Sequence, residues 1–179
     1  MPHCIRTTRL QLCPLRTDMA QRLAELGNDP IIAAQTANFP SPYTLEHAQA
    51  YISQAIASDG AKANPVFAIE LLDGTLAGVI NLKLNPRHRS GHLGYWMGAP
   101  YRGCGYMSEA ARALVRHGFE VLNLHRVESA CFAFNKASTR VLENAGLAPE
   151  GRKRQAFFKE GEFVDLLLFG AIAETISQA

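Results

Sequence analysis

Two glycines lie immediately before a helical pattern in the segment Arg102–Met107, which reads RGCGYM. The first N–H groups of a helix have no intrahelical partner, and the helix dipole adds partial positive charge at that end. Gly103 and Gly105 let the backbone approach a ligand closely, and Arg102 adds a cation beside the free amides. The segment therefore predicts an anion site of the kind that most often holds phosphate groups.

Three kinds of phosphate-binding loop compete for this segment. The P-loop pattern G-x-x-x-x-G-K-[ST] does not occur in the sequence. The dinucleotide fingerprint G-x-G-x-x-G fails because Ser108 stands at its third glycine position. A bare pyrophosphate cradle remains, and the alternative is a loop whose glycines serve turn geometry only.

Glu70 and His92 are the titratable candidates for moving a proton. Glu70 alternates with Ala68 and Leu72 on one face of a predicted strand, so it is a partly desolvated general base, a position open to water, or the partner of a nearby arginine. His92 shares a strand face with Gly94 and is either a proton relay at neutral pH or a structural histidine.

The hydrophobic periodicity predicts the elements that must position these residues. Helical spacing appears at 17–28, 44–58, 106–122 and 135–146, and loops are expected at 37–43 and 58–65. Strands are expected at 5–15, 66–72, 76–84, 92–97 and 125–133, followed by two more to the end, with an Asp-Gly hairpin turn at Asp73 and a turn near Gly161. This order predicts an α+β fold rather than a regular doubly wound sheet.

Length and composition exclude several classes of protein. The chain has 179 residues, 47% hydrophobic and 19% charged, with a net charge of +2, which fits one domain over 1–179 with a core at about 5–173. This balance argues against a disordered chain and against a direct nucleic-acid binder. The apolar stretch 166–173 is too short to span a membrane, and no signal peptide is visible, so a cytoplasmic location is expected.

The cysteines and histidines predict no disulfide framework and no metal site. The four cysteines, Cys4, Cys13, Cys104 and Cys131, show no C-x-x-C spacing, and without a secretion signal we expect reduced thiols. His88 and His92 are four residues apart across a loop and a strand start rather than on one helix face, which argues against a metal pair.

An ordered set of segments resembles the GNAT superfamily of acetyl-coenzyme A-dependent N-acetyltransferases, most closely its RimJ/RimL-like branch of ribosomal-protein N-terminal acetyltransferases. The similar segments cover nearly the whole chain and read TTRLQLCPL, PYTLEHAQAYI, LAGVINL, LGYWM, YRGCGYMSEA and NKASTRVLENAGLAPEG. The resemblance implies a mixed, mostly antiparallel twisted sheet of about seven strands flanked by about four helices. It also implies acetyl-CoA as co-substrate.

The same resemblance implies roles for particular residues. Backbone N–H groups of the loop would hold the coenzyme pyrophosphate, and the end of the strand at 92–97 would pair with the pantetheine arm. Asn135 would contact that arm, and Ser138 would lie near the thioester sulfur as the candidate acid for the leaving thiolate; the alternative for both is helix capping. The cofactor-binding set is thus Trp96, Met97, Gly98, Arg102, Gly103, Cys104, Gly105, Tyr106, Met107, Asn135 and Ser138.

Four positions depart from the family pattern. His92 stands where the branch often has a glutamate before LGY. Met107 stands where glycine or alanine is usual, and Leu147 replaces a phenylalanine. Leu142 occupies the position that holds a general-acid tyrosine in many GNAT enzymes, so that mechanism is not available there.

The expected activity is acetyl transfer to a primary amine by direct attack in a ternary complex, with backbone amides near Met97 stabilising the oxyanion. No covalent intermediate is needed, so Cys104 and Cys131 need not be nucleophiles. The acceptor is a small amine or a protein N-terminus, such as that of a ribosomal protein, and the chain acts as a monomer or a homodimer. The alternative is an acyl-CoA-binding sensor or partner domain without turnover.

Overall fold

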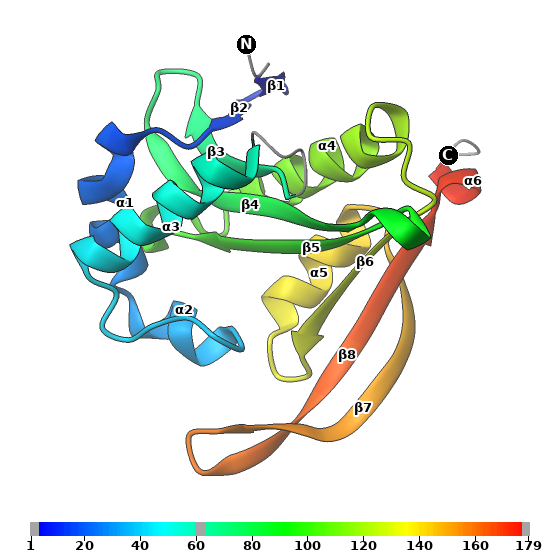
Figure 1. Cartoon of the computed structure of the whole chain (residues 1–179). Helices are drawn as coiled ribbons and strands as arrows, with labels where there is room; N and C mark the ends of the chain where they lie inside the picture. Colours follow the sequence, from blue (N-terminus) through cyan, green and yellow to red (C-terminus); the bar gives the residue numbers. More distant parts are fainter. Residues whose placement is uncertain (1–3, 60–63, 177–179) are drawn as a thin grey trace.

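One twisted sheet runs through the molecule in the computed structural model, which describes residues 4–59 and 64–176 (Figure 1). Its eight strands follow the order β1-β2-β3-β4-β5-β6-β8-β7, and only the β5–β6 pair is parallel. The strands are β1 Ile5–Arg6, β2 Leu10–Pro14, β3 Val66–Leu71, β4 Leu76–Asn85, β5 Ser90–Met97, β6 Arg126–Phe132, β7 Ala148–Lys159 and β8 Glu162–Ile172. The predicted α+β class and mixed, mostly antiparallel sheet are confirmed.

The four predicted helices are present, and two short ones accompany them in the described residues. The helices are α1 Ala20–Gly27, α2 Pro30–Gln35, α3 Leu45–Asp59, α4 Tyr106–Glu120, α5 Lys136–Asn144 and α6 Ala173–Ile176. Helix α2 forms because Asp29 Oδ1 accepts from the Ile31 N–H at 2.9 Å and Pro30 occupies its first turn. No helix within 4–59 and 64–176 is both long and apolar enough to cross a bilayer.

Helices cover both faces of the sheet, and each face has its own apolar core. Helices α1 and α3 pack on one face, where Leu23 and Ile52 meet Val79. Helices α4 and α5 cover the other face, where Leu114 and Leu142 are wholly buried (Figure 1). The central strands are therefore buried on both sides, as the unbroken run of buried residues from Leu76 to Ile80 in β4 shows.

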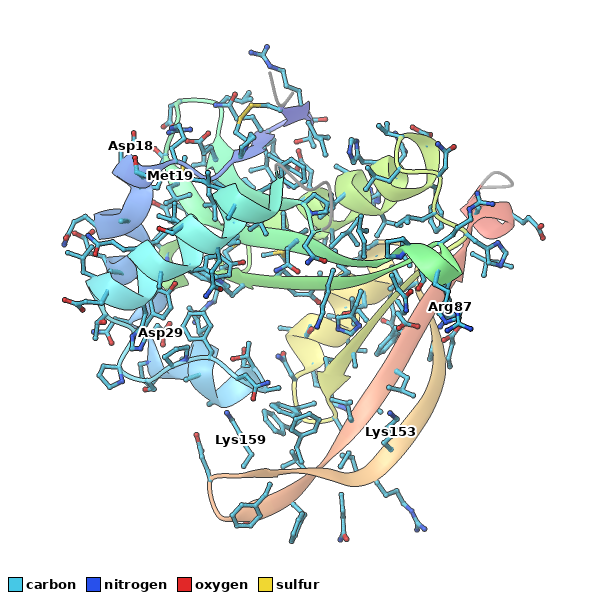
Figure 2. All side chains as sticks on the ribbon, in the orientation of Figure 1. Asp18, Met19, Asp29, Arg87, Lys153 and Lys159 are labelled. Atoms are coloured by element: carbon cyan, nitrogen blue, oxygen red, sulfur yellow. A yellow bond between two sulfur atoms is a disulfide. The ribbon has the colours of Figure 1, made fainter. Side chains whose placement is uncertain are left out.

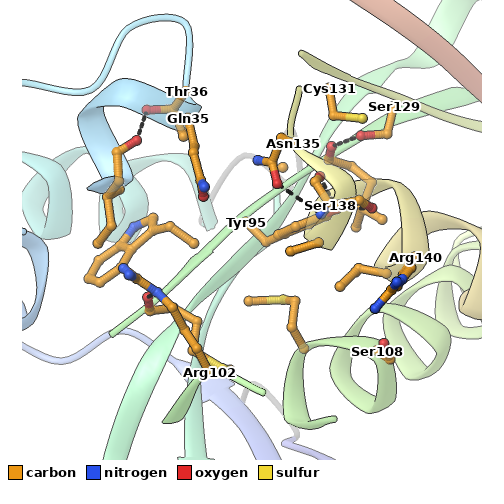
Figure 3. Close-up of a pocket in the computed structure, with 18 of the residues that line it drawn as sticks. Gln35, Thr36, Tyr95, Arg102, Ser108, Ser129, Cys131, Asn135, Ser138 and Arg140 are labelled. Carbon is orange, nitrogen blue, oxygen red and sulfur yellow. Dashed lines mark hydrogen bonds between the residues drawn. The ribbon is translucent and has the colours of Figure 1, made fainter. Parts of the chain in front are cut away.

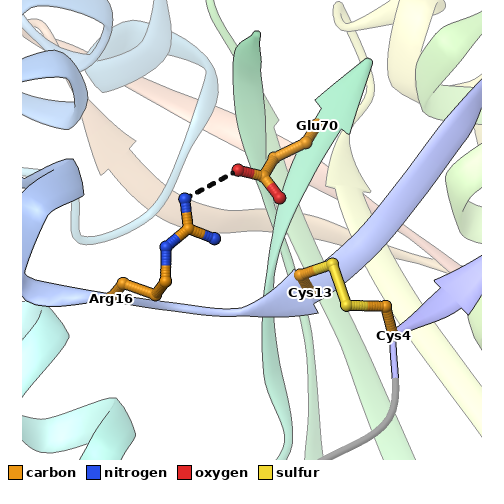
Figure 4. The surroundings of a disulfide bond; sticks show 4 residues. All are labelled: Cys4, Cys13, Arg16 and Glu70. Carbon is orange, nitrogen blue, oxygen red and sulfur yellow. Dashed lines mark hydrogen bonds and ion pairs between the residues drawn. A yellow bond between two sulfur atoms is a disulfide. The ribbon is translucent and has the colours of Figure 1, made fainter. Parts of the chain in front are cut away.

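The N-terminal segment corrects two predictions. The strand expected at 5–15 is two strands, because Thr7 turns the chain: its N–H donates to the Leu10 carbonyl at 2.9 Å. The sheet therefore has eight strands instead of about seven. The expectation of four reduced thiols is wrong for Cys4 and Cys13, which form a disulfide because the β1–β2 register places them opposite each other (Figure 4). Cys104 and Cys131 are free thiols.

The β7–β8 hairpin extends beyond the rest of the sheet, and its tip curves back toward α2 (Figure 1). Lys159, labelled near that tip in Figure 2, donates from Nζ to the Thr36 carbonyl at 2.9 Å. The hairpin tip is therefore tied to the loop after α2. The predicted loop at 58–65 lies partly outside the described residues, as do the ends of the predicted domain, at 1–3 and 177–179.

Candidate active site

Strands β5 and β6 separate at the middle of the sheet. Their parallel pairing covers only Ser90–His92 against Arg126–Glu128. Beyond it, β5 keeps its register with β4 as far as Met97, while the Ser129 hydroxyl donates to the Leu93 carbonyl at 2.8 Å across the widening gap. The last residues of β5 therefore present a strand edge that β6 does not pair.

A pocket of about 560 Å³ occupies this gap. Its walls are β5, β6, the loop before α4, the start of α4 and one side of α5, and α2 closes one side. Figure 3 shows Gln35 and Thr36 of the α2 end on one side, with Asn135 and Ser138 on the other. A pocket of this size suits a small organic ligand.

The glycine loop has the geometry that the sequence predicts for a backbone anion site. Gly103 and Gly105 have φ of 76° and 78°, and Gly105 directly precedes the first turn of α4. Both line the pocket with Tyr106 and Met107, and a Cβ added at Gly103 meets no atom within 4 Å. Unpartnered helix N–H groups beside open space therefore fit a phosphate-bearing ligand.

Arg102 lines the pocket but is already paired within the protein. Its Nη2 lies 2.8 Å from Asp29 Oδ2, and its Nε donates to the Met97 carbonyl at 2.9 Å. Because Asp29 also caps α2, Arg102 ties together the loop, the end of β5 and α2. The Arg102 guanidinium, which was expected to add a positive charge beside the amides, thus holds these three segments together.

Residues of the β1–β2 hairpin also hold the glycine loop in place, and the sequence analysis did not identify this contact. Arg9 Nη1 donates to the Cys104 carbonyl at 3.0 Å, and the Arg9 Nε to Glu109 Oε2 distance is 2.7 Å. Glu109 also accepts from the Thr7 hydroxyl at 2.6 Å. Arg9 further lies over the Tyr106 ring, 4.8 Å from its centroid. Desolvation acts to raise the Glu109 pKa, but these hydrogen bonds together lower it.

Asn135 and Ser138 meet at the start of α5. Asn135 is buried, and its Oδ1 accepts from the Ser138 N–H at 3.0 Å, which is the capping alternative considered for Asn135. The Ser138 hydroxyl instead faces β5, and its Oγ lies 2.8 Å from the Tyr95 hydroxyl (Figure 3). The sequence analysis did not identify Tyr95. Strand alternation does not specify which side of the widened gap its ring occupies.

The two titratable candidates lie in different places. Glu70 is buried outside the pocket lining, where Arg16 Nη2 donates to its Oε1 at 3.0 Å (Figure 4). This is the arginine-partner alternative. His92 lines the pocket, opposite Glu128 in the β5–β6 register. Desolvation is the main cause that lowers the His92 pKa, so its neutral form is favoured near pH 7.

The remaining predicted residues divide between the pocket and the packing around it. Trp96 and Met97 line the pocket. Gly98 and Cys104 are not among its lining residues; the Gly98 N–H donates to the Ala77 carbonyl at 2.9 Å, and a Cβ at Gly98 would lie 2.6 Å from Leu26. Leu142 is wholly buried in the core under α5.

The described lining of the pocket contains hydroxyls, amides, a histidine and two arginines, Arg102 and Arg140, but no aspartate or glutamate. Such a site can bind an anion at the α4 N-terminus, hold an extended arm along β5, and donate a proton from Ser138. It offers no carboxylate to take a proton from an acceptor.

Comparisons with known proteins agree with this architecture. Residues 9–148 match the model of the acetyltransferase (GNAT) domain. The putative ribosomal N-acetyltransferase YdaF of Bacillus subtilis is 33% identical over 113 residues, covering 63% of this chain and 62% of that protein. The ribosomal-protein-serine acetyltransferase of Escherichia coli is 30% identical over 101 residues, covering 56% of each chain.

The fold also matches a solved structure over almost its whole length. The ribosomal L7/L12 alpha-N-protein acetyltransferase RimL in complex with coenzyme A aligns with a TM-score of 0.88 at 21% identity, covering 97% of this chain and 99% of that one. The expected fold is confirmed, and the family model spans most of the sequence. The chain therefore belongs to the GNAT acetyltransferase family.

Proposed function

We propose that this protein transfers the acetyl group of acetyl-CoA to a primary amine by direct attack in a ternary complex. The main support is one arrangement: the open edge of β5, the glycine loop at the α4 N-terminus and the start of α5 meet around one pocket. Acetyl-CoA supplies an activated thioester, so no nucleophile of the protein has to form a covalent bond. The non-catalytic acyl-CoA binder remains the alternative.

Different residues of this pocket are proposed to bind different parts of acetyl-CoA. N–H groups of Gly103, Gly105, Tyr106 and Met107 are proposed to hold the pyrophosphate, because these residues line the pocket at the start of α4 and in the loop just before it. Trp96 and Met97 are proposed to lie along the pantetheine arm, and Asn135 beside it. Gly98, Arg102 and Cys104 complete the site indirectly: Gly98 allows the close packing of α1, and Arg102 and Cys104 shape the loop.

Ser138 is proposed as the acid that protonates the leaving thiolate. Its N–H is taken by Asn135 Oδ1, while its hydroxyl faces the pocket beside Tyr95. Neither Glu70 nor a pocket carboxylate is proposed as the base, since Glu70 is paired with Arg16 away from the pocket. His92 is the titratable group of the lining whose neutral form can accept a proton.

The lack of a carboxylate in the described lining favours a weakly basic acceptor. An α-amine titrates near ~7.8 and a lysine near ~10.4, so deprotonating lysine at neutral pH costs about 3.5 kcal/mol more. A protein N-terminus, such as that of a ribosomal protein, is therefore proposed ahead of polyamines; the names of YdaF and the Escherichia coli relative agree with this choice. One domain over residues 1–179, acting as a monomer or homodimer in the cytoplasm, is proposed as the catalyst.

A coenzyme A release assay tests the proposal. Ribosomal-protein N-terminal peptides, amino acids, polyamines and aminoglycosides are offered with acetyl-CoA, and the same peptides with blocked α-amines serve as controls. We expect release with free α-amines and little with polyamines. Thermal stabilisation by acetyl-CoA without release for any acceptor would favour the non-catalytic binder.

A further inference from the structure

Tyr95 reaches the proposed acid from the opposite wall of the pocket. It belongs to β5, yet its hydroxyl lies 2.8 Å from Ser138 Oγ and 3.4 Å from the Ser138 carbonyl, at the start of α5 (Figure 3). Both side chains line the pocket and are partly buried. A phenol and a serine hydroxyl are thus paired where the thioester is proposed to lie.

The other phenols of the pocket lining have different surroundings. The Tyr101 hydroxyl accepts from Arg22 Nη2 at 3.2 Å, and the Tyr106 ring lies under Arg9. Leu142, the position on α5 where many GNAT enzymes have a tyrosine, is buried in the core. Among the described lining residues, Tyr95 is the phenol whose hydroxyl contacts the proposed acid.

The direction of this hydrogen bond decides what Ser138 can do. A serine hydroxyl has one proton, and giving it to Tyr95 would leave none for a thiolate. A phenol is the stronger acid of the two and therefore the better donor. Desolvation raises the pKa of Tyr95, which keeps its proton in place at neutral pH. With Tyr95 as donor, Ser138 accepts on a lone pair and its own O–H is free to turn into the pocket.

We propose that Tyr95 is a positioning residue that acts through Ser138: it donates to Ser138 Oγ and so directs the serine proton toward the coenzyme sulfur. This inference rests on the proposed acetyl transfer. In that reaction the acceptor nitrogen bonds to the acetyl carbon, the carbon–sulfur bond breaks, and sulfur takes the Ser138 proton. The acceptor nitrogen releases one proton, which the neutral His92 can accept and pass to solvent, and Ser138 is reprotonated from solvent. The net change is one N–H exchanged for one S–H.

Steady-state kinetics of Tyr95→Phe, Ser138→Ala and the double variant test this role. Losing one hydrogen bond to the acid is expected to lower kcat about 10-fold with Tyr95→Phe, while the KM for acetyl-CoA stays within about two-fold. Ser138→Ala is expected to lower kcat about 100-fold. The double variant is expected to match Ser138→Ala, because Tyr95 has nothing left to position.

Tyr51→Phe is the matched control. Tyr51 is another partly buried phenol whose pKa desolvation raises, its hydroxyl bonds the Asn81 side chain, and it is not among the pocket-lining residues. It is expected to leave kcat unchanged. A merely structural Tyr95 would make the two losses multiply in the double variant, and that result would overturn the inference, as would a Tyr95→Phe enzyme with native kcat.

The failure of the proposed function looks different in the same experiment. If the native protein released no coenzyme A with any acceptor, acetyl transfer and the role of Tyr95 would both be rejected. If the native protein turned over and Ser138→Ala lowered kcat while Tyr95→Phe did not, acetyl transfer would stand and the Tyr95 inference alone would be refuted.

Discussion

Replacing Gly103 by alanine separates the cost of backbone strain from the cost of lost coenzyme binding. Gly103 has φ of 76°, and a Cβ there meets no protein atom within 4 Å. Gly74 offers a matched control, because it has φ of 86°, also has nothing within 4 Å, and lies in the β3–β4 turn away from the pocket lining. Both substitutions therefore add one methyl group to a left-handed backbone facing open space.

The two variants are expected to lose similar stability but different affinity. An alanine in the left-handed region costs about 1–2 kcal/mol, which corresponds to roughly 2–8 °C in Tm for a chain of this size. The methyl group at Gly103 also crowds the backbone where a phosphate is proposed to bind. Losing one charge-assisted hydrogen bond costs about 1.5–3 kcal/mol, or about 10- to 100-fold in Kd.

Differential scanning fluorimetry with and without acetyl-CoA measures both effects. At a concentration 100 times the native Kd, the native protein and Gly74→Ala gain about 2.7 kcal/mol, whereas a 30-fold weaker Gly103→Ala gains about 0.9 kcal/mol. If Gly103→Ala kept the full coenzyme-induced shift, the glycine loop would not be the pyrophosphate site.

Three other substitutions test the supports of the site. Folding lowers the Glu109 pKa, so the stability that Glu109 contributes is present above the ordinary glutamate pKa and is lost as pH falls through the pKa of the folded state. Glu109→Gln is therefore expected to flatten the acid side of a Tm-against-pH curve. An unchanged acid side would show that the pairing with Arg9 adds no stability. The pKa of His92 is also lowered in the folded state, so the free energy of unfolding is expected to fall as pH drops below about 6.5. Urea titrations of His92→Gln are expected to show a smaller fall over the same pH range. A steeper fall in His92→Gln than in the native protein would contradict the direction of this pKa shift. Leu142→Ala empties a wholly buried core position and is expected to cost about 2–5 kcal/mol of unfolding free energy by urea denaturation, whereas a loss below about 1 kcal/mol would mean that α5 repacks.

Strong local patterns in the sequence predicted most of the fold. The helical spacing behind Gly105 and the Asp73-Gly74 turn specify α4 and the β3–β4 hairpin without help from distant residues. The pairing of Cys4 with Cys13 depends on a turn at Thr7 that interrupts one apparently continuous strand. A register set by a single short turn leaves no periodic signal, so this disulfide was not predicted.

The same distinction applies to the site. The glycine loop and the Asn135 cap are local features, and the structure places both at the pocket. The ties from Arg102 to Asp29 and from Arg9 to Glu109 join residues far apart in the chain. Such pairs depend on the order of the strands in the sheet, which local periodicity does not specify.

The contacts of Thr7 and Arg9 make the β1–β2 hairpin a support of the proposed coenzyme loop. Affinity tags are commonly added near an N-terminus, and truncations commonly begin there. Any such change that disturbs the first hairpin also loosens the carbonyl of Cys104 and the first turn of α4. Kinetic comparisons between preparations are therefore meaningful only when the β1–β2 hairpin is intact in each of them.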